Sequence, residues 1–291
     1  MKVFLTGIKR LLLTLNLVAW AVPLCYADGG FPIFPNRLIL SPSVSYFFSG
    51  SQWNTHGIKK KFPFNRKYHS TVENLYAEFG INNRTAVYLN LPFVVNNYTQ
   101  DINPTSKTVS GPTYLESGVK YYLAKFKKRD YLSIQGGVIT SLFTNKSNLG
   151  YGQNGGEVYL NFSGPLRVGR MRTYFYLQEG VRKYIGTNAP TQDLYIGTWG
   201  ISLDKKLTNQ LALVVTGIKS WSPDKRFDSA IPIVNRNFLL FGPALAYIHY
   251  FSKYSSVTLR GGESLTGVNI GTNMTASLAY TYRIDYGKAK R

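Results

Sequence analysis

Charged side chains that could act on a solute are few in this 291-residue chain. Only 16% of the residues are charged, although the formal net charge is +20. Six of them fall within stretches of alternating apolar and polar residues: Glu78, Glu116, Lys120, Glu157, Arg260 and Arg283. Alternate residues of a β-strand face opposite sides, so all six are expected on the polar faces of strands. Opposed charges on such faces could select passing ions, or they could pair and fill a narrow interior.

The histidines give little indication of catalysis or metal binding. The chain has three, His56, His69 and His249, and a single cysteine, Cys25. His69 is adjacent to Ser70, so in a strand the two point to opposite faces and cannot form a local base–nucleophile pair. No two histidines have the spacing of a local metal site. We therefore expect a protein that is not an enzyme and needs no cofactor.

Two further patterns have structural explanations. Gly150, Gly152 and Gly155 match G-x-G-x-x-G, but a dinucleotide site needs a helix next, and "EVYLNFSG" indicates a strand. The basic runs "KKKFPFNRK", "AKFKKRD" and "GKAKR" lie at strand ends, where Lys and Arg meet lipid phosphates. No strand combines a basic face with stacking aromatics, so we do not expect nucleic acid as a partner. The first basic run predicts contact with lipopolysaccharide.

Alternation along the whole chain predicts the elements that position these charges. Twelve runs are expected as strands, near residues 38–49, 69–80, 84–96, 113–124, 131–143, 156–163, 172–184, 193–203, 210–221, 237–250, 256–264 and 273–285. Most are long enough for the 9–11 residues of a tilted strand that crosses a bilayer. Compact turns such as "INNR" and "DKKLTNQ" alternate with longer connections, which is typical of an outer-membrane meander barrel.

The apolar face of each strand could contact a protein core or lipid. In the hairpin "LYAEFGINNRTAVYLNLPFVV" this face holds Leu75, Ala77, Phe79, Val87, Leu89, Leu91 and Phe93. The opposite faces carry Ser, Thr, Tyr, Gln and isolated charges, which suit a wet interior better than a water-facing exterior. Lipid is therefore expected outside, with Glu78 and Asn90 in the lumen. The strands near 172–184, 193–203 and 237–250 cannot be oriented from their patterns.

Residues 1–27 are predicted to be a secretory signal peptide. They contain a basic start, the apolar run "LLLTLNLVAWAVPL" and the small residues of "CYA" before a cut after Ala27. The apolar run is too short for a membrane-spanning helix. A lipoprotein signal with Cys25 as the lipidated residue is the alternative, but Leu24 stands where such a signal has a small residue.

Three further segments complete the expected organisation. Residues 28–37 are rich in Pro and Gly and should lie in the periplasm or fold into the lumen as a plug. Residues 38–286 form the barrel, and residues 287–291 form a basic periplasmic tail. An even number of strands places both termini on the periplasmic side.

Several hairpins resemble those of known families. "LYAEFGINNRTAVYLNLPFV" resembles the hairpin of bacterial outer-membrane proteins named after the MetA pathway of phenol degradation. "GGEVYLNFSGPL", "FYLQEGVRKYIG" and "LYIGTWGISLDKKLTNQLALVV" are similar to the central part of the related XagA-like proteins. The resemblance implies an outer-membrane barrel that passes small, often hydrophobic, molecules. It brings no catalytic residues.

The sequence thus predicts an all-β transmembrane antiparallel barrel in a Gram-negative outer membrane. Passive, porin-like passage of small molecules, including hydrophobic or aromatic solutes, is the first functional hypothesis. The alternative is an envelope or surface interaction protein that uses the barrel only as an anchor. The connections predicted to face outward are of modest length, which favours transport. Outer-membrane lipid, lipopolysaccharide and, during biogenesis, the barrel-assembly machinery are the expected partners.

Overall fold

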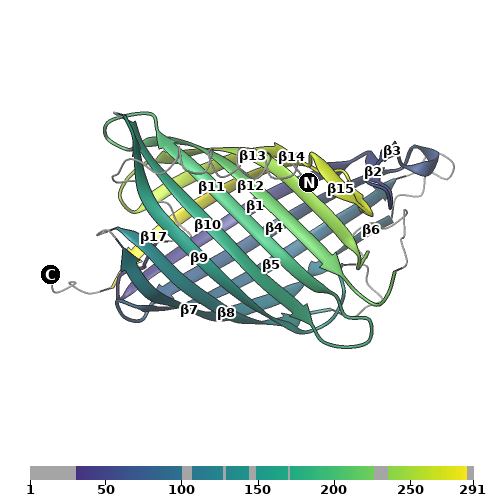
Figure 1. Cartoon of the computed structure of the whole chain (residues 1–291), viewed down its shortest axis with the longest axis horizontal. Helices are drawn as coiled ribbons and strands as arrows, with labels where there is room; N and C mark the ends of the chain where they lie inside the picture. Colours follow the sequence, from purple (N-terminus) through teal and green to yellow (C-terminus); the bar gives the residue numbers. More distant parts are fainter. Residues whose placement is uncertain are drawn as a thin grey trace, which may run out of the picture.

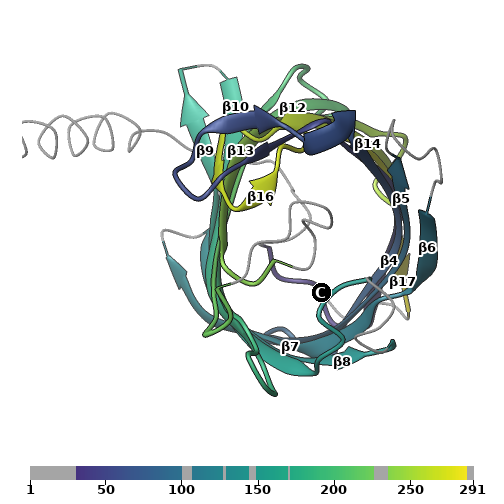
Figure 2. The ribbon, with the colours of Figure 1, turned by 90° about the vertical axis from the view of Figure 1, so that its right-hand side faces the viewer.

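The chain folds into one closed antiparallel β-barrel (Figure 1). The computed structural model describes residues 31–99, 107–126, 129–143, 149–169, 171–225 and 235–286. Twelve long strands of the described chain form the wall: β1 (Arg37–Ser49), β4 (Lys67–Gly80), β5 (Thr85–Thr99), β7 (Tyr114–Phe126), β8 (Asp130–Ser141), β9 (Gly155–Val168), β10 (Met171–Tyr184), β11 (Thr191–Ser202), β12 (Asn209–Trp221), β13 (Phe238–Tyr250), β14 (Ser255–Glu263) and β17 (Met274–Asp285). Wall strands pair in chain order, and β17 pairs with β1 to close the ring, which Figure 2 shows end-on. The predicted all-β meander is confirmed.

The two ends of the barrel differ. Five short hairpin turns within the described strands lie at the end where β1 starts and β17 finishes, here called the turn end. The opposite loop end carries the minor elements β2 (Ser51–Trp53), β3 (Lys59–Lys61), η1 (Pro63–Asn65), β6 (Lys107–Pro112), β15 (Thr266–Val268) and β16 (Ile270–Gly271). Of these, β16, β2 and β3 form a small separate sheet. No helix among the described residues is long and apolar enough to cross a membrane.

Side-chain to backbone hydrogen bonds close the turns. Asn82 Oδ1 accepts hydrogen bonds from the backbone N–H groups of Arg84 and Thr85, both at 2.8 Å. In the turn between β11 and β12, the Asp204 carboxylate accepts backbone hydrogen bonds from Thr208 and Asn209 at 3.0 and 2.6 Å. These bonds hold the pKa of Asp204 below its usual range. Backbone N–H groups in a turn have no partner on a neighbouring strand. The side chains of Asn in "INNR" and of Asp in "DKKLTN" accept hydrogen bonds from these groups, which explains why these residue types occur there.

One predicted boundary is wrong. The sequence indicates a short strand at 156–163 followed by a turn, whereas β9 continues to Val168. Pro165 lacks an N–H, yet the strand passes through it and keeps its register with β10. The turn instead lies at Gly169, whose φ of 60° belongs to the left-handed region that favours glycine.

The outer face of the wall is mostly apolar, although Glu73 of β4 and Glu179 of β10 also lie on it. Val119 is 46% exposed on this face, and Val158, Leu177 and Leu245 are exposed as well. A closed barrel with a band of exposed large apolar side chains matches the lipid-facing surface of a membrane barrel. The strands that could not be oriented from sequence also have apolar outer residues: Leu177 and Val181 in β10, Tyr195 and Trp199 in β11, and Leu239, Phe241, Leu245 and Tyr247 in β13.

Prolines interrupt the ladder at two places. The register between β1 and β17 skips Ser41 and Pro42, since proline has no N–H to donate. Near Pro92, β5 changes its partner from β7 to β6. Beside Pro42 the outer face has a hollow of about 530 Å³, whose lining includes Leu75 and Tyr280 and also Glu73.

Inside the barrel, tyrosine rings lie over glycines of neighbouring strands. A Cβ atom on Gly137 would lie 2.1 Å from the Tyr88 hydroxyl oxygen, and one on Gly118 would lie 2.8 Å from the same ring. Two further pairs have this arrangement: Tyr159 over Gly180, and Tyr174 over Gly200. Only glycine, which has no Cβ atom, lets a ring pack so closely against the backbone of the wall. The hydroxyl group of the ring then points towards strands further around the barrel.

Adjacent glycines of β8 allow a matched test of this packing. Gly137→Ala should destabilise the barrel by about 1–3 kcal/mol, because the new methyl group displaces Tyr88. Gly136→Ala is the control, since the nearest atom to its Cβ is a backbone oxygen at 4.0 Å. Urea unfolding of the refolded protein in lipid vesicles measures both. Equal urea midpoints for the two variants would show that the packing of the Tyr88 ring does not require glycine at position 137.

Candidate functional site

The structure places all six candidate charges on the inner face of the barrel. Glu78, Glu116, Lys120 and Glu157 are buried there, and Arg260 and Arg283 are partly exposed. The four buried charges come from β4, β7 and β9, and they belong to one half of the wall. The two arginines belong to β14 and β17 in the other half. The site is therefore asymmetric.

Glu78 and Lys120 form a buried ion pair across β5. The Lys120 ammonium lies 2.9 and 3.0 Å from the two carboxylate oxygens of Glu78. Both side chains are almost inaccessible, with 3% of Glu78 and 2% of Lys120 exposed. The Tyr76 hydroxyl donates a further hydrogen bond of 2.6 Å to Glu78. The carboxylate is thus held by a cation and a hydroxyl.

Arg182 joins the other two glutamates. Its Nη2 lies 2.8 Å from Glu157 Oε2 and also contacts Glu116 Oε1. Its Nε donates to the same Glu157 oxygen at 3.0 Å. The sequence left Arg182 and Glu179 unassigned, because their run in β10 has no clear polar face. The neighbouring strand β9 could have indicated the orientation of Arg182, because Glu157 lies directly opposite it in the register of the two strands.

Neutral donors complete the network. The hydroxyls of Tyr88 and Tyr159 donate to Glu157 at 3.0 and 2.9 Å. The amide of Asn90 donates to Glu116 at 2.8 Å. A buried ion pair offsets its desolvation only when its geometry is good and the remaining lone pairs are satisfied. These donors meet that condition. The Glu78–Lys120 pair and the cluster of Arg182 with Glu116 and Glu157, together called the charge network, are therefore stable elements on one side of the inner wall.

The inner faces of β1 and β17 are different. They carry small residues that stay partly accessible, whereas inward residues of β12 and β13 such as Ala212 and Ala246 are buried. The accessible residues are Ser41, Ser43 and Ser45 of β1, and Thr275, Ser277, Ala279 and Thr281 of β17. We call these seven residues the accessible stripe. Arg260 lies next to it, between Ser277 and Ala246 of the neighbouring strands, and has no ion-pair partner among the described residues. Small side chains with exposed surface inside a closed barrel indicate space beside them.

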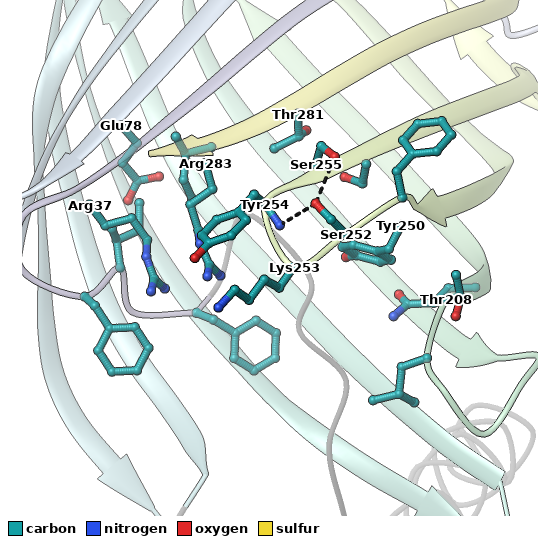
Figure 3. Close-up of a pocket in the computed structure, with 18 of the residues that line it drawn as sticks. Arg37, Glu78, Thr208, Tyr250, Ser252, Lys253, Tyr254, Ser255, Thr281 and Arg283 are labelled. Atoms are coloured by element: carbon teal, nitrogen blue, oxygen red, sulfur yellow. Dashed lines mark hydrogen bonds between the residues drawn. The ribbon is translucent and has the colours of Figure 1, made fainter. Parts of the chain in front are cut away.

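A cavity of about 620 Å³ opens on this side of the barrel at the turn end (Figure 3). We call it the vestibule. Residues of β1, β4, β12, β13, β14 and β17, of two hairpin turns and of the N-terminal segment line it: Phe31, Pro32, Ile33, Phe34, Arg37, Ile39, Tyr76, Glu78, Lys206, Leu207, Thr208, Gln210, Tyr250, Phe251, Ser252, Lys253, Tyr254, Ser255, Ser256, Thr281 and Arg283. Thr281 belongs to both the vestibule and the accessible stripe. The vestibule therefore adjoins the accessible stripe along β17.

The segment before β1 lies against the inner wall. The backbone oxygen of Phe31 accepts a 2.8 Å hydrogen bond from the hydroxyl of Tyr122, an inward residue of β7. Ile33 is buried, and the backbone N–H of Asn36 donates to the oxygen of Gly80 at 2.8 Å. Residues 31–36 thus narrow the turn end of the lumen. The predicted signal peptide (1–27) and tail (287–291) lie outside the described residues and stay predictions.

The histidines lie away from the lumen network. His69 contacts the Tyr46 hydroxyl at 2.5 Å, and His249 contacts Asn209 at 2.8 Å. The glycine-rich segment at 150–155 leads directly into β9. Within the part of the chain that the structure describes, no three His, Cys, Asp or Glu side chains are grouped as metal ligands.

Comparison with known proteins places the fold. No protein-family model matches the sequence, and no curated protein matches it. Among solved structures, the chain is similar to the COG4313 outer membrane channel from Pseudomonas putida F1, with a TM-score of 0.65 and 12% identity over 90% of this chain and 100% of that chain. The translocator domain of the autotransporter NalP from Neisseria meningitidis has a TM-score of 0.48 and 10% identity, over 96% of this chain and 95% of that chain. The TodX monoaromatic hydrocarbon channel deltaS2 mutant has a TM-score of 0.46 and 9% identity, over 89% and 92%. The chain has the fold of an outer-membrane barrel.

Removing one partner of the buried pair should cost more stability than removing both. Lys120→Met leaves Glu78 charged without its cation and should destabilise the barrel by about 3–5 kcal/mol. The double variant Glu78→Gln, Lys120→Met should recover most of this loss. Unfolding in urea, followed by heat-modifiable gel migration, compares the two. A single variant as stable as the parent protein would show that water reaches Glu78.

Proposed function

We propose that this protein passes small solutes passively across a bacterial outer membrane. The accessible stripe is the observation that supports this best, because it continues the vestibule along β17 in the half of the lumen that the charge network leaves free. No covalent chemistry is needed for such a role. The charge network then supports the wall opposite the passage and keeps it in place.

The solutes proposed are small and include hydrophobic or aromatic molecules. Aromatic and apolar side chains of the vestibule, such as Phe31, Tyr250 and Phe251, support this choice. The hairpins that resemble proteins named after phenol degradation point in the same direction. The structural similarity to an outer membrane channel supports the architecture, whereas the choice of solute rests on the lining of this lumen.

The turn end is proposed to face the periplasm. Short turns on that side and longer connections on the outer side are the pattern of outer-membrane barrels. At the loop end, Lys59, Lys60 and Lys61 of β3 are all exposed. Their position supports contact with lipopolysaccharide phosphates at the cell surface.

A tryptophan in the accessible stripe should obstruct the passage. In planar bilayers, the purified protein should give discrete conductance steps, and Ala279→Trp should lower the unit conductance by about half or more, because pore width limits passage. Leu278→Trp is the matched control, since Leu278 is exposed on the outer, apolar face.

Two results would contradict the proposal. Equal conductance for the two tryptophan variants would place the passage elsewhere. Absence of any conductance from correctly folded protein would favour the alternative that the barrel is only an anchor.

A further inference from the structure

The vestibule carries an excess of positive charge. Arg37, Lys206, Lys253 and Arg283 line it, whereas Glu78 is the one carboxylate among its described lining residues. Glu78 is already bound by Lys120 outside the cavity. Asp285 at the rim accepts from Arg37 at 2.6 Å and lies 3.4 Å from Arg283. Positive charge therefore exceeds negative charge around the cavity even when Asp285 is counted, and the space between the cations favours an anion.

Arg283 is incompletely bonded. Its Nε is buried and has no hydrogen-bond partner among the described residues. Its Nη2 reaches Asp285 only at 3.4 Å, a long contact for a charged pair. The side chain is 26% exposed, so the guanidinium still has a surface towards the cavity, as Figure 3 shows. The exposed edge of this guanidinium can therefore donate to a ligand in the cavity, and such a charge-assisted hydrogen bond would be stronger than the long contact with Asp285.

Aromatic rings surround these cations. The Arg283 guanidinium carbon lies 5.1 Å from the centre of the Tyr254 ring, and the Lys253 ammonium lies 4.8 Å from the same ring. On the other side, the Arg37 guanidinium lies 4.6 Å from the centre of the Phe34 ring. The rings provide apolar surface at the level of the charges. A volume of about 620 Å³ is in the range of sites for small organic ligands.

We propose that the vestibule is a binding site for small aromatic carboxylates. Arg283 receives the carboxylate through the exposed edge of its guanidinium, with Lys253 beside it. The aromatic ring of the ligand packs among Tyr250, Tyr254 and Phe34. A bare inorganic anion would leave this apolar surface wet, and a neutral aromatic molecule would leave Arg283 unpaired. This assignment rests on the proposed function, because the site lies where a solute enters or leaves the accessible stripe.

Binding can be measured without transport. Isothermal titration of the detergent-solubilised protein with phenylacetate should show saturable binding. 2-Phenylethanol, which keeps the ring and lacks the charge, and acetate or phosphate, which keep a charge and lack the ring, should each bind at least about tenfold more weakly. This comparison uses the unaltered protein and does not depend on how a variant folds.

Variants then assign the carboxylate contact. Arg283→Gln should weaken phenylacetate binding by about tenfold or more, and Arg283→Lys should retain part of it, because a lysine keeps the charge but not the fork of donors. Arg84→Gln is the control, since Arg84 is an exposed residue of another turn at the same end and does not line the cavity. Heat-modifiable migration verifies that each variant is folded.

The outcomes separate this inference from the proposed function. Equal affinity for phenylacetate and 2-phenylethanol, or unchanged affinity in Arg283→Gln, overturns the anion site even if the protein conducts. Equal affinity for phosphate and phenylacetate overturns the aromatic part and leaves a general anion site. Phenylacetate binding that depends on Arg283 in a protein without conductance upholds the site and overturns passage.

Discussion

Arg182 holds two buried glutamates at once, and the asymmetry of the lumen depends on this contact. Glu116 and Glu157 come from β7 and β9, and the arginine from β10, so one side chain joins the inner face across four strands. Without the arginine, two carboxylates would lie close together in a dry space, at a large cost in desolvation and repulsion. The pairing also explains how buried carboxylates are accommodated on the inner face.

The inner face of the barrel has two different parts. We call the part with the charge network the filled half and the part with the accessible stripe the free half. In the filled half, glycines allow tyrosine rings to lie close to the backbone, and the hydroxyls of Tyr88 and Tyr159 reach Glu157. In the free half, the inward positions of β1 and β17 carry Ser, Thr and Ala, which leave space. Residue size at alternate positions thus separates a densely packed part of the inner face from a part with accessible side chains.

Most of the barrel was accessible from sequence because alternation has a direct physical meaning. A strand with lipid on one side is mostly apolar at every second residue, and all twelve predicted runs correspond to wall strands. The same rule predicted an outward Val119 and an inward Lys120, as the structure has them. It failed at the end of β9, where "SGPLRVG" contains turn-forming residues but lies between paired neighbours that keep it extended.

The site could be predicted only in part. Alternation shows that Glu78 and Lys120 face inward, but it does not show that the two meet across β5, because this depends on strand register and tilt. Arg182 was missed because its strand is mixed on both faces. The vestibule was also missed, since its cations come from the start of β1, the end of β17 and two turns that are far apart in sequence.

Thiol accessibility inside the lumen tests the division into two halves most directly. In a Cys25→Ser background, Ser277→Cys lies in the accessible stripe, and Ser133→Cys replaces a fully buried inward residue of β8 in the filled half. A small charged methanethiosulfonate reagent added to the folded protein in bilayers should modify Ser277→Cys rapidly and reduce its conductance. Ser133→Cys should remain unmodified. Rapid modification at both positions, or at Ser133→Cys alone, would contradict a lumen that is filled on one side and free on the other.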